Sequence, residues 1–211
     1  MRLGGRYRRR VASTRQRGRR TQQERTEATT GALVAAAREL FAVDGYAATS
    51  LDAVVASAQV TKGALYHHFA GKRELFAAVF AQEQERVLAE VAAAYGRHRD
   101  PWRAFEAGCQ AFLEACLDPG TQRIFLLDAT AALGWETIRA LESSSLQAMQ
   151  AALDRAMAAG RLPRRPTAPL AHLLFGAICE GAMVVARAED RDAAQKAMLS
   201  ELRRLLRALS A

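Results

Sequence analysis

The segment from Gly45 to Phe76 constrains this chain more than any other part of it. It reads GYAATSLDAVVASAQVTKGALYHHFAGKRELF, and its apolar spacing predicts two short helices joined by a tight turn. The second of these helices carries polar and aromatic side chains on the face turned away from the core. A helix presented in this way is how many proteins enter the major groove of DNA. The sequence therefore predicts a helix-turn-helix with a nucleic-acid partner.

Local signals define the ends of these helices. An earlier helix is indicated by an apolar stripe at spacing i, i+4, i+7 and i+8, formed by Leu33, Ala37, Leu40 and Phe41. Gly45 follows its last turn, where a helix needs a residue that tolerates the left-handed conformation. Thr49 or Ser50 caps the next helix, and Thr61 caps the third.

The third helix, which begins after Thr61, divides its side chains between two faces. At 3.6 residues per turn, Leu65 and Phe69 point toward the core. The opposite face is formed by Gly63, Ala64, Tyr66 and His67. Its two small residues allow the backbone to approach base edges closely, and its polar side chains, with the helix N-terminus, suit phosphates and bases.

At these residues the chain resembles the tetracycline-repressor (TetR) family of transcriptional regulators. The resemblance covers about residues 28–80. It rests on Leu40-Phe41, Gly45-Tyr46, Thr49-Ser50, the run Val60–Phe69, Lys72, Glu74 and Leu75.

The resemblance implies two sets of DNA contacts. The residues expected to clamp phosphates are Thr49, Thr61, Tyr66 and Lys72, and those expected to face the bases are Lys62, Gly63, Ala64 and His67. Ser50, the alternative cap, completes the predicted DNA-binding set. His68 is expected to be a partly buried flanking residue.

Gln59 departs from the family pattern, which usually has glycine in this turn. If the turn requires a positive φ, a non-glycine residue costs about 1–2 kcal/mol relative to glycine. The geometry of the turn is therefore the one questionable part of the motif.

The charge of the chain is unevenly distributed. The net charge is +8, yet residues 1–20 contain nine arginines and no acidic residue. The remaining residues carry 21 of the 30 basic side chains against all 22 acidic ones. The body is therefore almost neutral, and the N-terminal segment carries the excess charge.

We expect residues 1–25 to form an arginine-rich tail that is disordered when free, because it has little apolar content. Three interpretations of it remain open. It is an arm that enters a minor groove or neutralises phosphates, a solvated extension with weak nonspecific effects, or a segment preceding a later translation start, for instance at Val11.

Composition excludes several other classes of protein. No uninterrupted apolar run reaches 18 residues, so we expect no membrane-spanning segment, and no signal-peptide core follows the basic start. The cysteines, Cys109, Cys116 and Cys179, lack a C-x-x-C spacing and are interpreted as core residues in a reducing compartment. We expect a cytoplasmic protein without a cofactor or a metal site.

The pattern beyond residue 70 is helical throughout, so the predicted fold class is all-α with about nine helices. Helices are expected at 72–95, 101–116, 124–127, 135–159, 167–187 and from Asp190 onward, with breaks at Gly134 and Gly160. The expected domains are a helix-turn-helix domain at 26–72 and a ligand-binding and dimerisation domain at 73–211.

The helix at 167–187 is apolar almost all round and must be covered on every side. We therefore expect a homodimer in which this helix and the last one pack against their copies. The predicted interface residues are Leu170, Leu174, Ile178, Leu202, Leu205, Leu206 and Leu209. A two-fold dimer would bind a palindromic operator with two recognition helices.

The resemblance also implies a small-molecule effector bound in the C-terminal domain. The candidate lining residues are Trp102, Phe105, Cys109, Phe112, Phe125, Trp135, Met149, Phe175 and Cys179. Charged residues are scarce among them, which favours a largely apolar ligand. These positions are equally compatible with ordinary core packing, and His172 and Glu180 are candidate polar contacts of the ligand or of the dimer.

Two alternatives compete with a homodimeric repressor released by this ligand. An enzyme would have to use pairs such as His172 with Cys179 or His98 with Asp100, for which the sequence identifies no orienting third group. An architectural DNA-binding protein would rely on the arginine-rich tail and bind with little sequence preference.

Overall fold

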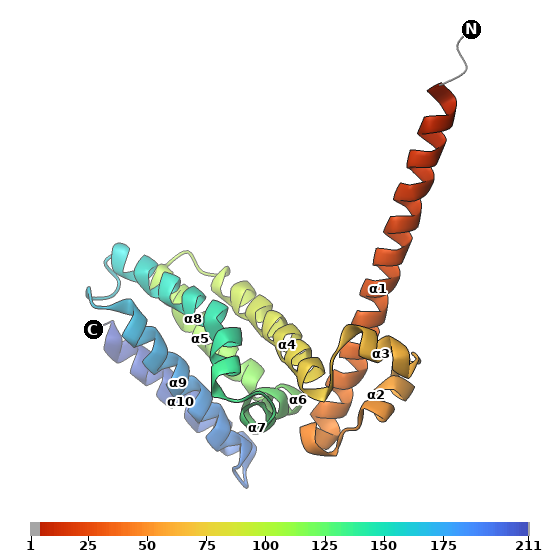
Figure 1. Ribbon diagram of the computed structural model, residues 1–211. Helices are drawn as coiled ribbons and strands as arrows, with labels where there is room; N and C mark the ends of the chain where they lie inside the picture. Colours follow the sequence, from red (N-terminus) through yellow and green to blue (C-terminus); the bar gives the residue numbers. More distant parts are fainter. Residues whose placement is uncertain (1–4, 211) are drawn as a thin grey trace.

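The computed structural model describes the backbone of residues 5–210 and the side chains from Gln22 to Ser210, and this part of the chain is all-α (Figure 1). Its elements, of which η1 is a π-helix, are α1 (Gly5–Ala48), α2 (Leu51–Ser57), α3 (Lys62–His68), α4 (Lys72–Tyr95), α5 (Pro101–Cys116), α6 (Pro119–Gln122), η1 (Arg123–Asp128), α7 (Ala129–Leu133), α8 (Trp135–Ala158), α9 (Thr167–Ala186) and α10 (Arg191–Leu209). Because α6, η1 and α7 follow one another without a break, residues 5–210 form nine separate helices, in agreement with the sequence prediction.

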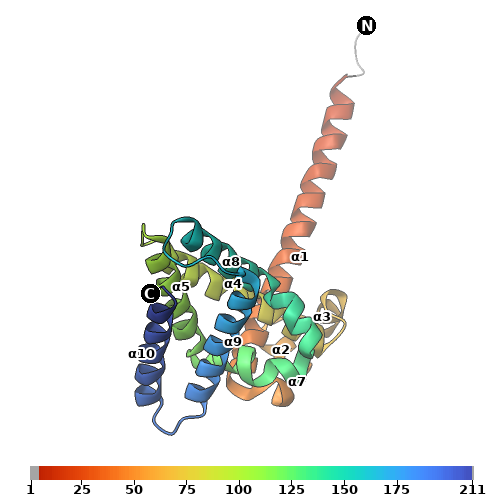
Figure 2. The same ribbon diagram turned by 90° about the vertical axis from the view of Figure 1, so that its left-hand side faces the viewer.

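Two hydrophobic cores organise the described residues. Helices α1 to α3 lie at one end of the molecule, and α4, α5, α8, α9 and α10 form a bundle at the other (Figures 1 and 2). The first core also takes Phe76 and Phe80 from α4, Ile124 from η1 and Leu133 from α7. The two cores are therefore joined through the shared helix α4 and do not separate at residue 72.

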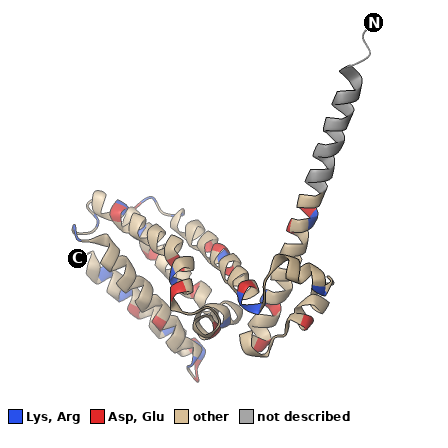
Figure 3. Ribbon diagram, viewed as in Figure 1, with Lys and Arg blue, Asp and Glu red and all other residues tan. Residues whose placement is uncertain are grey.

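The predicted tail lies mostly outside the described side chains. Residues 22–25 are described and belong to α1, and the disorder of the free tail stays a prediction. Residues 1–21 lie outside the described side chains, and over the coloured part of Figure 3 charges of both signs are interspersed.

The caps predicted for the second and third helices are present. Ser50, rather than Thr49, caps α2, and its Oγ accepts the Ala53 N–H at 3.1 Å. Thr61 Oγ1 accepts the Ala64 N–H at 3.2 Å at the start of α3. Asp100 caps α5 ahead of a proline at its first position, and Asp190 caps α10. Each such cap contributes about 1 kcal/mol.

The turn between α2 and α3 has a positive φ at Gln59. Gln59 has φ +55°, which confirms the expectation for a site where the family usually has glycine. The Gln59 N–H donates to Ala56 O, and the Val60 N–H donates to Val55 O. This hydrogen-bond pattern is a Schellman motif, which closes a helix through a left-handed residue.

At Gly45 the backbone conformation excludes residues other than glycine. Its φ of +83° and ψ of 167° lie in a region that only glycine occupies readily. A Cβ at this position would also collide with the guanidinium of Arg123. The kink at Gly45 therefore lets η1 approach the end of α1.

Helix α9 is long and apolar enough to cross a membrane by length and composition alone, with a mean hydropathy of 1.6. The expectation of no such segment overlooked it because His172 and Glu180 interrupt the apolar run. In the structure Leu174, Ile178 and Ala182 of α9 are buried in the bundle core. The core helix of a globular protein can have the same length and hydropathy. The buried side of α9 packs as in such a core helix.

Candidate nucleic-acid interface and ligand cavity

Helix α3 presents most of its predicted DNA contacts to solvent. Its buried side is anchored by Leu65, which is 0% exposed, and Phe69 follows at its end. The exposed residues are Ser50, Thr61, Lys62, Gly63, Tyr66 and His67, whereas Ala64 is half-buried. The hydroxyls of Ser50 and Thr61 accept capping hydrogen bonds, and each keeps its own O–H as a donor for a phosphate.

Two of the predicted phosphate contacts are engaged within the protein. Thr49 is 3% exposed, and its Oγ1 donates to Gly45 O at 2.8 Å. Lys72 Nζ donates to the carbonyl oxygens of Tyr46, Ala47 and Thr49 at 2.7, 3.1 and 2.9 Å. An ammonium group has three donors, so all of them are used. In this structure the two side chains hold the corner between α1 and α2, and their contact with a phosphate stays a prediction.

Lys62 is not a free cation on the recognition helix. Its Nζ lies 2.7 Å from Asp52 Oδ1 of α2, and both side chains are exposed. The hydrogen bond and charge of Asp52 raise the pKa of Lys62. A DNA strand that uses Lys62 must therefore compete with Asp52 for it.

The two adjacent histidines lie differently. His67 is exposed, and His68 is half-buried with Nδ1 3.3 Å from Thr30 Oγ1 of α1. This confirms His68 as a flanking residue.

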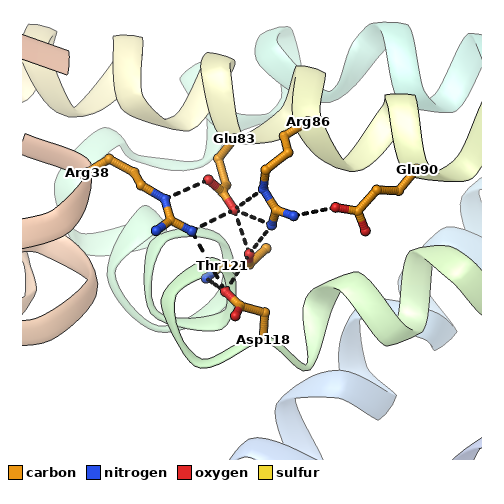
Figure 4. Close-up of polar contacts among 6 residues, drawn as sticks. All are labelled: Arg38, Glu83, Arg86, Glu90, Asp118 and Thr121. Carbon is orange, nitrogen blue, oxygen red and sulfur yellow. Dashed lines mark hydrogen bonds and ion pairs between the residues drawn. The ribbon is translucent and has the colours of Figure 1, made fainter. Parts of the chain in front are cut away.

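A buried carboxylate joins the DNA-binding domain to the bundle (Figure 4). Glu83 of α4 is 3% exposed and accepts from Arg38 Nε of α1 at 3.1 Å, from Arg86 Nε at 3.0 Å and from Thr121 Oγ1 of α6 at 2.5 Å. Burial favours the protonated form of Glu83, but these hydrogen bonds outweigh it and lower its pKa to about 2. Glu83 therefore fixes α1, α4 and α6 against one another as a charged group.

A second contact joins the same two regions at η1. Asp128 Oδ2 accepts the Tyr46 N–H at 2.7 Å, and Arg123 Nη2 donates to Asp44 O at 3.1 Å. Arg73 Nη2 of α4 donates to Leu133 O of α7 at 2.9 Å. The end of α1 is thus held by polar groups from both ends of η1.

The bundle contains a cavity of about 240 Å³ between α4, α5, α8 and α9. Five of the nine predicted ligand residues line it: Phe105, Cys109, Phe112, Met149 and Phe175. The cavity is also lined by four residues that were not predicted, Leu88, Val91, Tyr95 and Arg155. The first three share one face of α4 at helical spacing, a signal that was available in the sequence.

The other four predicted ligand residues lie elsewhere. Trp102 is buried but does not line this cavity, and Phe125 packs on Phe80 with ring centroids 4.7 Å apart. Trp135 is 62% exposed at the start of α8, and Cys179 lies outside the cavity. Aromatic and sulfur side chains at helical spacing fill cores as well as pockets, so the pattern alone did not separate the two.

The predicted dimer residues differ in their exposure. Leu174, Ile178, Leu202 and Leu206 are buried in the core of the protomer, so they do not form its free apolar face. The exposed residues of α9 at helical spacing are Leu173, Gly176, Ala177, Glu180 and Val184. Leu205 of α10 is 45% exposed. The all-round apolar pattern predicted two covered sides but not which residues faced which side.

The candidate catalytic pair of His172 and Cys179 lacks a reactive thiol. Burial raises the pKa of the Cys179 thiol to about 12, so the thiol stays protonated and is a poor nucleophile. His172 is exposed. Within residues 22–210, no group of three or more His, Cys, Asp or Glu side chains is placed to hold a metal ion.

A helix-turn-helix with an exposed second helix, joined to a helical bundle with an internal cavity, defines a class: two-domain, DNA-binding transcriptional regulators. Comparison with known domain families agrees with this class. Residues 33–79 match the domain described as bacterial regulatory proteins, tetR family, and residues 102–209 match the tetracyclin repressor-like C-terminal domain. The chain belongs to the TetR family of transcriptional regulators.

Individual relatives are similar over different lengths. A TetR-family regulator from Pectobacterium atrosepticum, known from its crystal structure, is 35% identical with a TM-score of 0.78, over 89% of this chain and 97% of that one. The transposon Tn10 TetC protein of Escherichia coli is 33% identical over 60% of this chain and 62% of its own length. The regulator UidR of Escherichia coli K12 is 39% identical over 32% of this chain and 34% of its own.

Proposed function

We propose that this protein is a homodimeric repressor that binds a palindromic operator through α3 and releases it when a small, largely apolar ligand fills the cavity in the bundle. The observation that carries the proposal is the exposed face of α3, with Thr61, Lys62, Gly63, Tyr66 and His67 on a buried anchor. The almost neutral body supports recognition by placement of these side chains over nonspecific attraction. A cytoplasmic location goes with this function.

The exposed stripe of α9 supports a dimer. Leu173 is 72% and Val184 51% exposed, and between them Gly176 and Ala177 permit close approach of a second backbone. Exposed apolar stripes of this kind usually mark an interface. A two-fold contact between α9 and α10 and their copies would place two α3 helices for adjacent half-sites.

Selection of binding sites from random DNA tests the DNA-binding part of the proposal. We expect a palindromic consensus with half-sites about one helical turn apart, bound by two protomers. An architectural protein would instead enrich no consensus and would bind with a steep salt dependence. Recovery of no consensus would contradict the proposal.

The dimer is tested by Leu173→Asp, with Lys196→Asp, an exposed position of α10, as the matched control. Sedimentation at micromolar protein should show a dimer for the natural chain and for the control, and a monomer for Leu173→Asp, because the charge cannot be buried in the interface. A monomer for the natural chain would contradict the dimer.

A further inference from the structure

The polar side chains of the cavity gather at its ends, while its middle is apolar. Helices α4 and α8 both begin beside the DNA-binding domain and end on the far side of the bundle (Figure 1). Tyr95 is the last residue of α4, and Arg155 lies in the last turn of α8; both line the cavity. Ser145 lines the opposite end of the α8 wall and accepts from Gln84. The far end thus carries the only charged side chain that lines this cavity among the described residues.

Arg155 is held in position without being neutralised. Its Nε donates to the Tyr95 hydroxyl at 3.0 Å, and its guanidinium carbon lies 5.2 Å from the centroid of the Tyr95 ring. No carboxylate within residues 22–210 forms an ion pair with it. By contrast, the nearby Arg161 pairs with Asp100 at 2.7 Å. A planar guanidinium whose Nε is engaged still offers its terminal nitrogens to a carboxylate.

The surroundings of Arg155 are strongly cationic. Residues 96–103 and 154–166 contain seven arginines and two aspartates. The Arg161–Asp100 ion pair shows that these two segments are in contact, and both connections lie at the same end of the bundle (Figure 3). Such a concentration of one sign attracts an anionic ligand to this end of the cavity.

The size of the cavity limits the apolar part of the ligand. At about 30 Å³ for each water-sized group, a volume of about 240 Å³ holds about eight methylene-sized groups. Gly108 lines this space, and a Cβ there would lie 3.5 Å from Val91, in ordinary van der Waals contact. The cavity therefore has room for a single alkyl chain of medium length.

We propose that the cavity binds a medium-chain carboxylate, with its alkyl chain between α4, α5, α8 and α9 and its carboxylate on Arg155. The inference rests on the proposed function in taking this cavity as the effector site. It goes further by assigning the ligand a charged group and a residue that binds it. Tyr95 is a positioning residue that orients the guanidinium.

Calorimetry on the complete chain with octanoate and with 1-octanol, which has the same chain length and no charge, tests the inference. Octanoate should bind at least about tenfold more tightly, because the charge-assisted hydrogen bonds form only with the carboxylate. Arg155→Gln should weaken octanoate by about tenfold or more and change 1-octanol by less than about threefold. Arg164→Gln, which removes the same charge at the same end of the bundle without lining the cavity, should leave both affinities unchanged.

Ala152→Leu tests whether the ligand binds inside the cavity rather than on its rim. The larger side chain fills the space from α8 and should weaken both probes. Equal binding of octanoate and 1-octanol, no effect of Arg155→Gln, or no octanoate binding at millimolar concentration would each overturn the inference.

Operator release separates this inference from the proposed function. If octanoate binds through Arg155 but leaves operator DNA bound, the ligand class stands and the effector role fails. If octanoate does not bind while random DNA yields a palindromic consensus, the ligand class fails and the DNA-binding function stands.

Discussion

Glu83→Gln tests whether the buried carboxylate is the charged joint between the two domains. Glu83 accepts hydrogen bonds from Arg38, Arg86 and Thr121, and its pKa is lowered from 4.5 to about 2. At about 1.36 kcal/mol for each pKa unit, this shift corresponds to about 3 kcal/mol of stability at neutral pH. Glutamine has no charge and turns an N–H₂ group toward one of the arginines, so we expect a loss of about 3 kcal/mol.

The pH dependence gives this prediction a second signature. A carboxyl whose pKa is lowered in the folded state stabilises the protein above its unfolded pKa, and this contribution is lost as the pH falls toward the folded pKa. Between pH 7 and pH 4 the difference between the natural chain and Glu83→Gln should therefore shrink by roughly 1 kcal/mol.

Urea denaturation at fixed protein concentration, at pH 7 and at pH 4, measures both the loss of stability in Glu83→Gln and its decrease in acid. The control is Glu90→Gln on the same helix, because Glu90 forms an exposed ion pair with Arg86, and such pairs contribute less than about 1 kcal/mol. If Glu83→Gln costs no more than Glu90→Gln, or if its cost does not decrease in acid, the assignment of Glu83 as a charged joint is wrong.

Three further predictions concern the helix-turn-helix. Gln59→Gly should raise the free energy of unfolding by about 0.5–1 kcal/mol, because glycine removes the strain of the positive φ and its larger backbone entropy in the unfolded state cancels only part of that gain. Urea denaturation measures this change, and Gln59→Ala, the control, should change the free energy of unfolding little. A lower stability of Gln59→Gly would contradict the strain at Gln59. Lys72→Met should lower the free energy of unfolding by about 2–3 kcal/mol, since three carbonyl oxygens lose their donor. If the variant is instead as stable as the natural chain but binds DNA more weakly, Lys72 acts as a phosphate contact. Tyr66→Phe should lower the affinity for all operator variants alike by about tenfold, because a hydrogen bond to a charged phosphate is lost. Lys62→Ala and His67→Ala should instead change the preferred bases in a binding-site selection. Uniform losses of affinity for all three variants would refute these roles.

The local features of the fold were predictable because they depend on neighbouring residues. The cap at Thr61 and the breaks at Gly134 and Gly160 are short-range signals, and all were confirmed. The positive φ of Gln59 followed from comparison of one position with the family pattern.

The site was predicted less completely because it depends on contacts between distant segments. Thr49 and Lys72 match the family motif, yet their donors are used by carbonyl oxygens of the α1–α2 corner. The pairing of Arg155 with Tyr95 joins residues 60 positions apart, and no periodicity shows it. For α9, a helix apolar on all sides gave no signal to separate Leu174, which is buried, from Leu173, which is exposed.

The specificity ratio of DNA binding tests the central claim most directly. The affinity for the selected operator is measured against the same DNA with both half-sites scrambled, at physiological salt, for the complete chain and for the chain without residues 1–20. Recognition by α3 predicts a ratio of about a thousandfold or more that survives removal of the arginine-rich segment. A ratio below about tenfold, or one that disappears with residues 1–20, would contradict sequence recognition by this helix.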